Sequence, residues 1–447
     1  MSVNARQLAL QILYEVQSKG SYANIALSSA LNRQELAPAD RGFCTELVYG
    51  TLRRQGTIDY ILSKFIKQPL HKLPPKILLN LRLGAYQLLF MDKIPPSAAV
   101  NEAVKLAKRF GHQGTASLTN AMLRNIDRKR AEIAADDFYP DKQQQPAEYL
   151  AAKYSHPLWL AAEWLNNFGL ADAEKMCEFD NQPTPYTLRT NTLKISRDEL
   201  LTRMTEQGIT AEPLSFPEEA MLITGGNPAE FISQGLVYPQ QITSMLAAHI
   251  LAPKAGSVVV DTCAAPGGKT THMAALMQNE GRINAFDVHE HKLQLINANA
   301  QRLGIEIIQT AAADSRRLDS IPPNSTDYIL VDAPCSGLGV LRSRPDSRWR
   351  KQEQTSAELA EIAYQILCEA ATKLKIGGKL LFSTCTVSEL ENQQNVRRFL
   401  AEHPNFAPEP ITYLPELFEY KTEMQFLPHQ HGLEGFYFAK FTKVGDK

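Results

Sequence analysis

No stretch of the 447-residue sequence stays apolar for the ~20 residues needed to cross a bilayer. The N-terminus, MSVNARQLALQILYEV, has no small-residue cleavage site and carries Glu15 where a signal peptide would remain apolar. The six cysteines include no CxxC pair, so the sequence shows neither a zinc-site spacing nor a disulfide framework. We therefore expect a cytoplasmic protein without membrane segments or bound metal, and we expect it to act as a monomer.

The chain also has almost no net charge, −1 overall, but this value hides an asymmetry. Residues 1–135 contain 19 Lys and Arg against 9 Asp and Glu, a net of +10, and the remainder carries −11. A basic N-terminal third favours a polyanionic partner, most simply nucleic acid, with Arg128, Lys129 and Arg130 as candidate RNA contacts. A solvated basic face without a partner explains the charge equally well, so charge alone leaves both interpretations open.

The N-terminal third has the hydrophobic pattern of helices. Leu8, Ile12 and Val16 recur at a spacing that gives one apolar helix face. Prolines separate the later helical stretches, as expected of residues that interrupt helices. A polar segment within residues 131–150, rich in Asp, Gln and Ala, follows and is interpreted as a linker.

Strands enter the pattern after this segment. Short strands and a helix, in which Ser196 and Glu199 fit a capping box, predict a small α+β module over residues 145–235. From residue 236 to 445, near-continuous apolar strands alternate with helices. This alternation predicts a parallel sheet that is buried on both faces and binds ligands at the carboxyl ends of its strands.

Two phosphate-binding motifs are missing where the first strand of this sheet, SVVVD, enters the Gly-rich turn CAAPGGKTT. A Walker A loop needs glycine five residues before Gly268, where Cys263 stands, and no GxGxxG is present. Instead, three successive strands end in carboxylates, Asp261, Asp287 and Asp314, which suit the ribose and adenine of a nucleoside. A nucleoside without a phosphate clamp favours S-adenosylmethionine (AdoMet). Helix capping explains one such aspartate more easily than three.

Two later strands each end near a cysteine. LVDAPCSG contains Asp332 and Cys335, and LLFSTCT contains Cys385. Both thiols are expected beside the cofactor, where Lys269 and Asp332 could activate a thiolate nucleophile. The residues alone do not say which thiol attacks first. Three of the remaining cysteines, Cys44, Cys177 and Cys368, are expected to be small buried side chains. Cys263 lies in the Gly-rich turn and is expected to line it.

The motifs VDTCAAPGGKT, FDV, DAPCSGLG and FSTCTVSELENQQNV together resemble those of the Sun/Fmu family of RNA cytosine-5 methyltransferases. The segments ARQLALQIL, LVYGTLRR and LRLGAYQLLFM resemble the NusB-like RNA-binding domain. The resemblance covers essentially the whole chain and is weakest in the middle. It implies a multidomain protein with an all-α NusB-like domain (1–135), a small α+β linker module (145–235) and an α/β Rossmann-like AdoMet-dependent methyltransferase domain (236–445).

The same resemblance assigns roles to residues. It implies that Cys385, after threonine, is the nucleophile that attacks C6 of one cytosine in small-subunit (16S) ribosomal RNA. Cys335, after proline, is assigned to product release, and Asp332 and Lys269 complete the catalytic set. The implied AdoMet-binding residues are Cys263, Ala264, Ala265, Pro266, Gly267, Gly268, Lys269, Asp287, Asp314 and Asp332.

Two other functions fit the sequence less well. An amino-methyltransferase usually carries an Asn/Asp-Pro-Pro-aromatic motif to hold the amine, and DAPC lacks the second proline and the aromatic ring. A non-catalytic RNA-binding or assembly factor would not need both thiols and the cofactor aspartates. Cytosine-5 methylation of RNA is therefore the favoured hypothesis.

Overall fold

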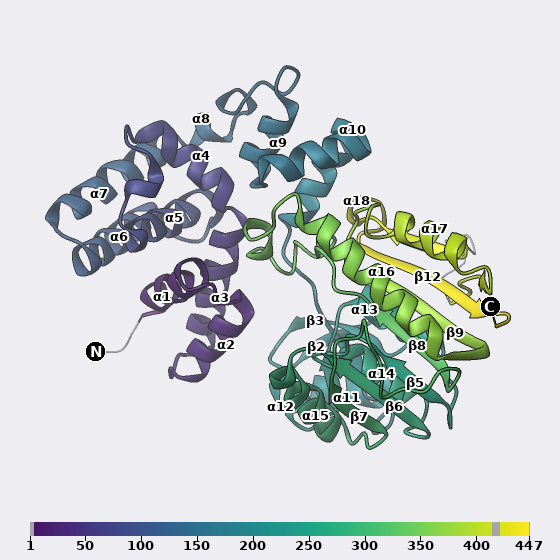
Figure 1. Cartoon of the computed structure of the whole chain (residues 1–447). Helices are drawn as coiled ribbons and strands as arrows, with labels where there is room; N and C mark the ends of the chain where they lie inside the picture. The colour runs from purple at the N-terminus through teal and green to yellow at the C-terminus, as the bar shows by residue number, and fades with distance from the viewer. Residues whose placement is uncertain (1–3, 414–420, 447) are drawn as a thin grey trace. The chain divides into compact units, whose positions relative to one another are not determined.

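The computed structural model describes residues 4–413 and 421–446 and divides into two compact units (Figure 1). Unit 1 contains the chain up to Pro183 together with Leu341–Glu353. Unit 2 contains Thr184–Val340 and the chain from Gln354 onward. The segment Leu341–Glu353, called the excursion below, thus leaves unit 2, packs in unit 1 and returns.

Unit 1 is helical, as predicted. Leu8, Ile12 and Val16 are buried on one face of the first helix, and α5 and α6 each begin at a proline, a residue well suited to a first helical turn. The helices are α1 (Ala5–Ser18), α2 (Ala23–Asn32), α3 (Pro38–Arg53), α4 (Gln55–Phe65), α5 (Pro75–Phe90), α6 (Pro96–Phe110), α7 (Gln113–Arg128), α8 (Arg130–Ala134), α9 (Pro146–Tyr154) and α10 (Leu158–Asp180), with short 3-10 helices at Leu70–Lys72, Asp136–Phe138 and Ser347–Trp349.

The polar segment 131–150 is more structured than its composition indicates. It contains α8, a 3-10 helix and the start of α9. Tyr139 within it stacks on Tyr60 of α4, with ring centroids 5.7 Å apart. Aromatic packing therefore orders this segment within unit 1 despite its polar sequence.

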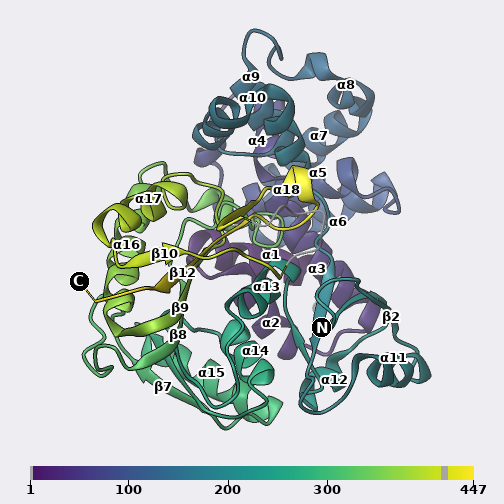
Figure 2. The same cartoon turned by 90° about the vertical axis from the view of Figure 1, so that its right-hand side faces the viewer.

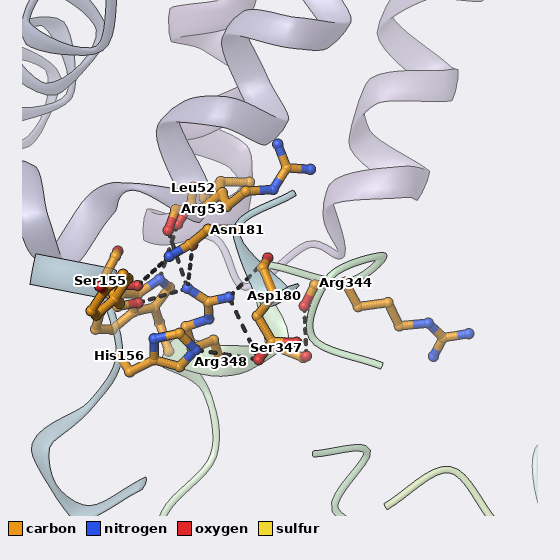
Figure 3. Close-up of polar contacts among 11 residues, drawn as sticks. Leu52, Arg53, Ser155, His156, Asp180, Asn181, Arg344, Ser347 and Arg348 are labelled. Carbon is orange, nitrogen blue, oxygen red and sulfur yellow. Dashed lines mark hydrogen bonds and ion pairs between the residues drawn. The ribbon is translucent and has the colours of Figure 1, made fainter. Parts of the chain in front are cut away.

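A fully buried arginine anchors the excursion in unit 1 (Figure 3). Nη1 of Arg348 donates to the backbone carbonyls of Ser155 (2.7 Å) and Arg53 (3.2 Å) and to Oδ1 of Asn181 (3.2 Å). Its Nη2 donates to the Asp180 carbonyl (3.3 Å) and lies 4.0 Å from the Asp180 carboxylate. One side chain therefore joins the ends of α3, α9 and α10.

Neighbouring residues of the excursion add further bonds within unit 1. Nε1 of Trp349 donates to the Leu52 carbonyl at 3.1 Å, and Nη1 of Arg350 donates to the Gly20 carbonyl at 2.8 Å. Backbone carbonyls at helix ends lack partners within their own helix, and here side chains from a distant part of the sequence supply them.

Unit 2 begins with a small antiparallel sheet in the order β2-β3-β1-β4. Ser196 caps α11, the longer helix of this module, by accepting a hydrogen bond from the Glu199 amide. This is one half of the predicted capping box, because the Glu199 carboxylate bonds Arg203. The elements are β1 (Tyr186–Thr190), α11 (Arg197–Glu206), β2 (Thr210–Pro213), β3 (Ala220–Gly225), α12 (Ala229–Ser233) and β4 (Val237–Pro239).

The larger sheet of unit 2 has the order β10-β12-β9-β8-β5-β6-β7, with β11 beside β12. Figure 2 labels five of these strands: β10, β12, β9, β8 and β7. Its strands are β5 (Val258–Asp261), β6 (Arg282–Asp287), β7 (Ile308–Ala312), β8 (Thr326–Asp332), β9 (Leu374–Thr384), β10 (Phe406–Pro408), β11 (Glu423–Phe426) and β12 (Phe436–Lys443). Its helices are α13 (Ile242–Leu251), α14 (Gly268–Leu276), α15 (Glu290–Leu303), α16 (Thr355–Lys373), α17 (Gln393–Glu402) and α18 (Pro428–His431).

Helices cover both faces of this sheet. Val259 and Leu381 pack with side chains of α13–α15, whereas Val260 and Leu380 pack with α16 and α17. Alternate residues of each strand therefore enter different cores, which explains the continuous apolar strand sequences. The predicted Rossmann-like α/β architecture is confirmed.

The sheet is mixed rather than wholly parallel. Strands β5 to β9 are parallel, but β12 pairs antiparallel with β9, Phe438 lying opposite Ser383. Strand β12 follows β11 as an antiparallel partner, so it enters the sheet without the crossover helix that a parallel strand requires. Among the helices that the structure describes, none has the length and apolar character needed to span a membrane.

Candidate active site

The Gly-rich turn connects β5 to α14 at the carboxyl edge of the sheet. Gly267 precedes α14 with φ +100°, a left-handed conformation that favours glycine. The amide of Ala264 donates to the Phe286 carbonyl of β6 at 2.7 Å, and the amide of Gly267 donates to the Ala264 carbonyl at 2.7 Å. The turn is therefore fixed by its own backbone and by the neighbouring strand.

The strand-ending aspartates have different surroundings. Asp261 is buried and accepts a hydrogen bond from Thr270 Oγ1 at 2.7 Å, and burial raises its pKa to about 7. Asp287 is 8% exposed at the end of β6, the strand next to β5. Asp314 lies two residues beyond β7, is exposed and pairs with Arg316 at 2.6 Å. The structure thus places Asp287 beside the turn and Asp314 just after the outer strand, β7.

A lysine of the turn reaches the carboxylate that ends β8. Lys269 Nζ lies 2.7 Å from Asp332 Oδ2, and Oδ1 of Asp332 accepts a hydrogen bond from Ser383 Oγ at 2.8 Å. Burial acts to lower the pKa of Lys269, but the charge and hydrogen bond of Asp332 outweigh it and raise that pKa. Lys269 is therefore a fixed cation between β5, β8 and β9.

The two predicted thiols meet at this edge. Cys335 Sγ lies 3.2 Å from Cys385 Sγ and accepts a hydrogen bond from the Cys385 amide at 3.3 Å. The hydrogen bond with the Cys385 thiol and the burial of Cys335 raise the pKa of Cys335 well above its usual range. Residues separated by fifty positions in sequence thus form one thiol pair, because β8 and β9 are parallel neighbours.

A buried glutamate holds the loops that carry both thiols, and the sequence did not single it out. Glu391 is 1% exposed; its Oε2 accepts from the Ser336 amide at 2.7 Å and its Oε1 from Ser336 Oγ at 2.5 Å. Thr386 Oγ1 lies 2.7 Å from Ser336 Oγ and 3.4 Å from the same carboxylate. The residues that follow Cys335 and Cys385 are therefore tied to one anion.

Its neighbour, Asn392, fixes the end of β9. The Asn392 side chain accepts from Thr384 Oγ1 at 2.6 Å and donates to the Thr386 carbonyl at 3.1 Å. Both residues belong to the sequence SELEN that follows the second thiol. The sequence offers one signal, an adjacent acid and amide shortly after a cysteine motif, but it does not indicate that both side chains are buried.

The structure also shows where the other cysteines and the basic triplet lie. Cys44 and Cys177 are buried in unit 1, and Cys368 is a half-buried residue of α16 that packs against the core of the large sheet. Cys263 lines the turn, where burial raises its pKa. Arg128, Lys129 and Arg130 follow one another at the end of α7 and the start of α8, with Lys129 and Arg130 2.9 Å from Glu132 and Asp127 respectively.

One group of potential metal ligands is present among the described residues: Glu219, His249 and His272. The His249 and His272 Nε2 atoms lie 2.8 and 2.7 Å from Glu219 Oε1. Two ligands of one tetrahedral zinc ion, with bonds of ~2.1 Å, stand about 3.4 Å apart. The observed distances are shorter than this. They fit hydrogen bonds between a buried carboxylate and the two imidazoles on either side of it. Burial, followed by the charge of Arg189, lowers the pKa of His272 to about 3.

Three family models match the chain in sequence order. The NusB family covers residues 3–128, the ferredoxin-like domain of RsmF/B-like methyltransferases covers 156–230, and 16S rRNA methyltransferase RsmB/F covers 248–442. "Probable ribosomal RNA small subunit methyltransferase B" of Bacillus subtilis (strain 168) is 41% identical over 450 residues, 99% of each chain. The chain belongs to the RsmB/F family of 16S rRNA methyltransferases. The predicted resemblance to the Sun/Fmu family and to NusB is confirmed.

A second curated relative and two solved structures are similar to this chain over nearly their whole lengths. A Synechocystis protein described by the same words is 36% identical over 99% of this chain and 100% of its own. The crystal structure of PH0851 is 27% identical, with a TM-score of 0.82 over 99% of this chain and 100% of that one. NSun6 from Pyrococcus horikoshii, solved with SFG, is 25% identical, with a TM-score of 0.59 over 65% of this chain and 99% of its own.

Proposed function

We propose that this protein transfers a methyl group from AdoMet to C5 of one cytosine in 16S ribosomal RNA through a covalent adduct between Cys385 and C6. The observation that carries the proposal is the thiol pair, with Sγ atoms 3.2 Å apart, at the sheet edge that also holds the Lys269–Asp332 pair. A single thiol suits many roles, but two thiols at one sheet edge suit a reaction that forms and then breaks a carbon–sulfur bond.

The chemistry follows from the weak nucleophilicity of cytosine C5. Addition of the Cys385 thiolate to C6 moves the ring electrons toward N3 and makes C5 nucleophilic, which is covalent catalysis. In this proposal Asp332, which Lys269 and Ser383 hold in place, hydrogen-bonds the N3 and N4 edge of the cytosine. AdoMet supplies the methyl group that C5 takes.

The adduct must then break. A base removes the C5 proton, the C5–C6 double bond re-forms, and the Cys385 sulfur leaves as thiolate. A hydrogen bond from Cys335 stabilises that leaving sulfur, and the raised pKa of Cys335 keeps its proton in place for this role. The family resemblance implies that Cys385 starts the reaction and that Cys335 helps to end it, and the raised pKa of Cys335 agrees with this order.

The proposed AdoMet site consists of the turn from Cys263 to Lys269 with Asp287, Asp314 and Asp332. The Gly267–Gly268 backbone allows close approach of a ligand, and Asp287 lies where a ribose diol binds in sheets of this type. SFG, the ligand of the NSun6 structure, is an analogue of AdoMet. In this proposal residues 1–135 and 145–235 bind RNA around a catalytic domain of residues 236–445, and the protein acts as a monomer in the cytoplasm.

The function is tested by mapping 5-methylcytosine with bisulfite sequencing of ribosomal RNA. Cells with and without this protein are compared, and the deletion strain is complemented with the unaltered chain. We expect one cytosine of 16S RNA to lose its protection from deamination in the deletion strain and to regain it on complementation. An unchanged pattern throughout 16S RNA would refute the proposal.

Charge reversal of Arg128, Lys129 and Arg130 to glutamate is expected to weaken RNA binding and to flatten its salt dependence. The surface ion pairs of Lys129 and Arg130 contribute little to stability, so phosphates can compete for these side chains. Each lost phosphate contact reduces the slope of log K against log salt by about 0.7–0.9. Fluorescence anisotropy with a 16S fragment at several salt concentrations measures both quantities.

Reversal of Lys375, Arg397 and Arg398 provides the matched control. These residues lie in the proposed catalytic domain, outside the proposed RNA-binding parts, and each is paired with a nearby acid, at 2.6, 3.1 and 2.8 Å respectively. An equal loss of affinity in both triple variants would show that the effect reflects net charge rather than a contact site at the end of α7.

A further inference from the structure

An arginine from the small sheet forms hydrogen bonds with the first turn of α14. Arg189, in β1, donates from Nη1 to the Gly268 carbonyl at 2.7 Å and to Gln240 Oε1 at 2.5 Å. Its Nη2 donates to Thr271 Oγ1 at 3.0 Å. Thr271 Oγ1 in turn donates to the Gly267 carbonyl at 2.7 Å. The guanidinium is therefore linked to both glycines that carry the turn into the helix.

The cost of burying this cation is high. Arg189 is 2% exposed, and its guanidinium carbon lies 5.2 Å from the centre of the Tyr238 ring. Burial lowers its pKa to about 10, so it remains charged at neutral pH. Its hydrogen-bond acceptors are all neutral, and the charge of Glu219 only partly offsets the effect of burial on its pKa. Burying a charge lowers stability unless its hydrogen bonds are well formed. A residue kept for packing alone would be apolar.

We propose that Arg189 is a positioning residue that holds the Gly267–Gly268 turn in the conformation that binds AdoMet. The inference rests on the proposed function in one respect, that AdoMet is the methyl donor. It adds that the small sheet, beyond any contact with RNA, completes the cofactor site. Binding sites need their supporting groups held to within about half an ångström, and a planar two-armed donor fixes a backbone turn better than a single point charge.

The test measures AdoMet affinity by isothermal titration calorimetry on the full chain without RNA. We expect Arg189→Met to raise the Kd for AdoMet about tenfold, the equivalent of one lost hydrogen bond, and to raise KM for AdoMet with little change in KM for RNA. The Kd of Arg189→Lys is expected to lie between those of the unaltered chain and Arg189→Met, because lysine keeps the charge but cannot bond Gly268 and Thr271 at the same time. If Arg189→Met fails to fold, Thr271→Val takes its place in the test. This variant removes one hydrogen-bond acceptor of Arg189 and is also expected to raise the Kd for AdoMet.

Arg302→Met is the matched control. Arg302 also faces the Tyr238 ring, at 5.7 Å, and it bonds the Ile232 carbonyl of the same module at 2.6 Å. Arg302 makes these contacts from α15. Its replacement therefore weakens the packing of the module but leaves the hydrogen bonds between Arg189 and α14 in place. If Arg302→Met weakens AdoMet binding as much as Arg189→Met, or if no Arg189 or Thr271 variant changes the Kd, the positioning role is wrong while cytosine methylation can still stand. Failure of the unaltered chain to bind AdoMet would overturn both.

Discussion

Cys385→Ala is expected to abolish methyl transfer, by at least about a thousandfold, while leaving AdoMet affinity unchanged. Without the thiolate, C6 is not attacked and C5 stays too weakly nucleophilic to take the methyl group. Transfer of tritiated methyl from AdoMet to a 16S fragment measures the loss, and calorimetry measures AdoMet binding. We expect methyl transfer to fall while AdoMet affinity stays the same, because the two depend on different segments. Cys385 follows β9, whereas the proposed AdoMet-binding turn connects β5 to α14.

Cys335→Ala is the informative counterpart. The adduct should still form through Cys385, but the leaving sulfur loses its thiol partner 3.2 Å away, so a covalent protein–RNA complex is expected to accumulate. The complex appears as a slowly migrating band on a denaturing gel and disappears when both cysteines are replaced. Cys368→Ala, which removes a thiol at the edge of the α16 core, serves as the control and should leave turnover intact.

The roles of the two thiols are open to direct reversal. If Cys385→Ala traps the RNA and Cys335→Ala merely stops the reaction, Cys335 is the nucleophile and the order proposed here is wrong. Methylation by the Cys385→Ala protein at the rate of the unaltered chain would exclude covalent catalysis through this residue altogether.

Arg348→Met is expected to destabilise the protein by about 3–5 kcal/mol. Methionine has a similar length, but the substitution leaves buried carbonyls of Arg53, Ser155 and Asp180 without their donor and the Asp180 carboxylate without its cation (Figure 3). Guanidinium-induced unfolding followed by far-UV circular dichroism measures the change.

Arg344→Met is the matched control for this substitution. Arg344 belongs to the same excursion, but it is exposed, and Figure 3 shows its guanidinium directed away from the cluster. Its replacement should alter the free energy of unfolding by less than about 0.5 kcal/mol. Equal destabilisation by both variants would show that the excursion, rather than the buried cation, is sensitive to substitution.

Local sequence patterns predicted most of the fold. The helical face of Leu8, Ile12 and Val16, the cap at Ser196 and the strands that end at Asp261 and Asp332 all appear as expected. These features depend on residues close together in the chain. The encounter of Cys335 with Cys385 could also be anticipated, because the carboxyl ends of parallel strands share one edge.

The residues that were missed depend on long-range contacts. Arg189, Glu391 and Arg348 are charged, and a charged residue in a sequence is expected on the surface unless its partners are known. The side-chain partners of Arg189 lie 51–82 residues away in the chain and those of Arg348 lie 167–295 residues away. The shortest hydrogen bonds of Glu391 join it to Ser336, 55 residues away. The antiparallel β12 was missed for a related reason, since strand periodicity does not record direction.

The excursion also constrains how this protein can be divided or recombined. A protease that cuts after Pro183 does not free the helical part, because residues 341–353 remain packed in it. A chain that begins at Thr184 carries Arg348 and Trp349 without the acceptors they bond. An exchange of the N-terminal 183 residues between homologues must therefore bring a matching 341–353 segment with it, so these two stretches should be inherited as a pair.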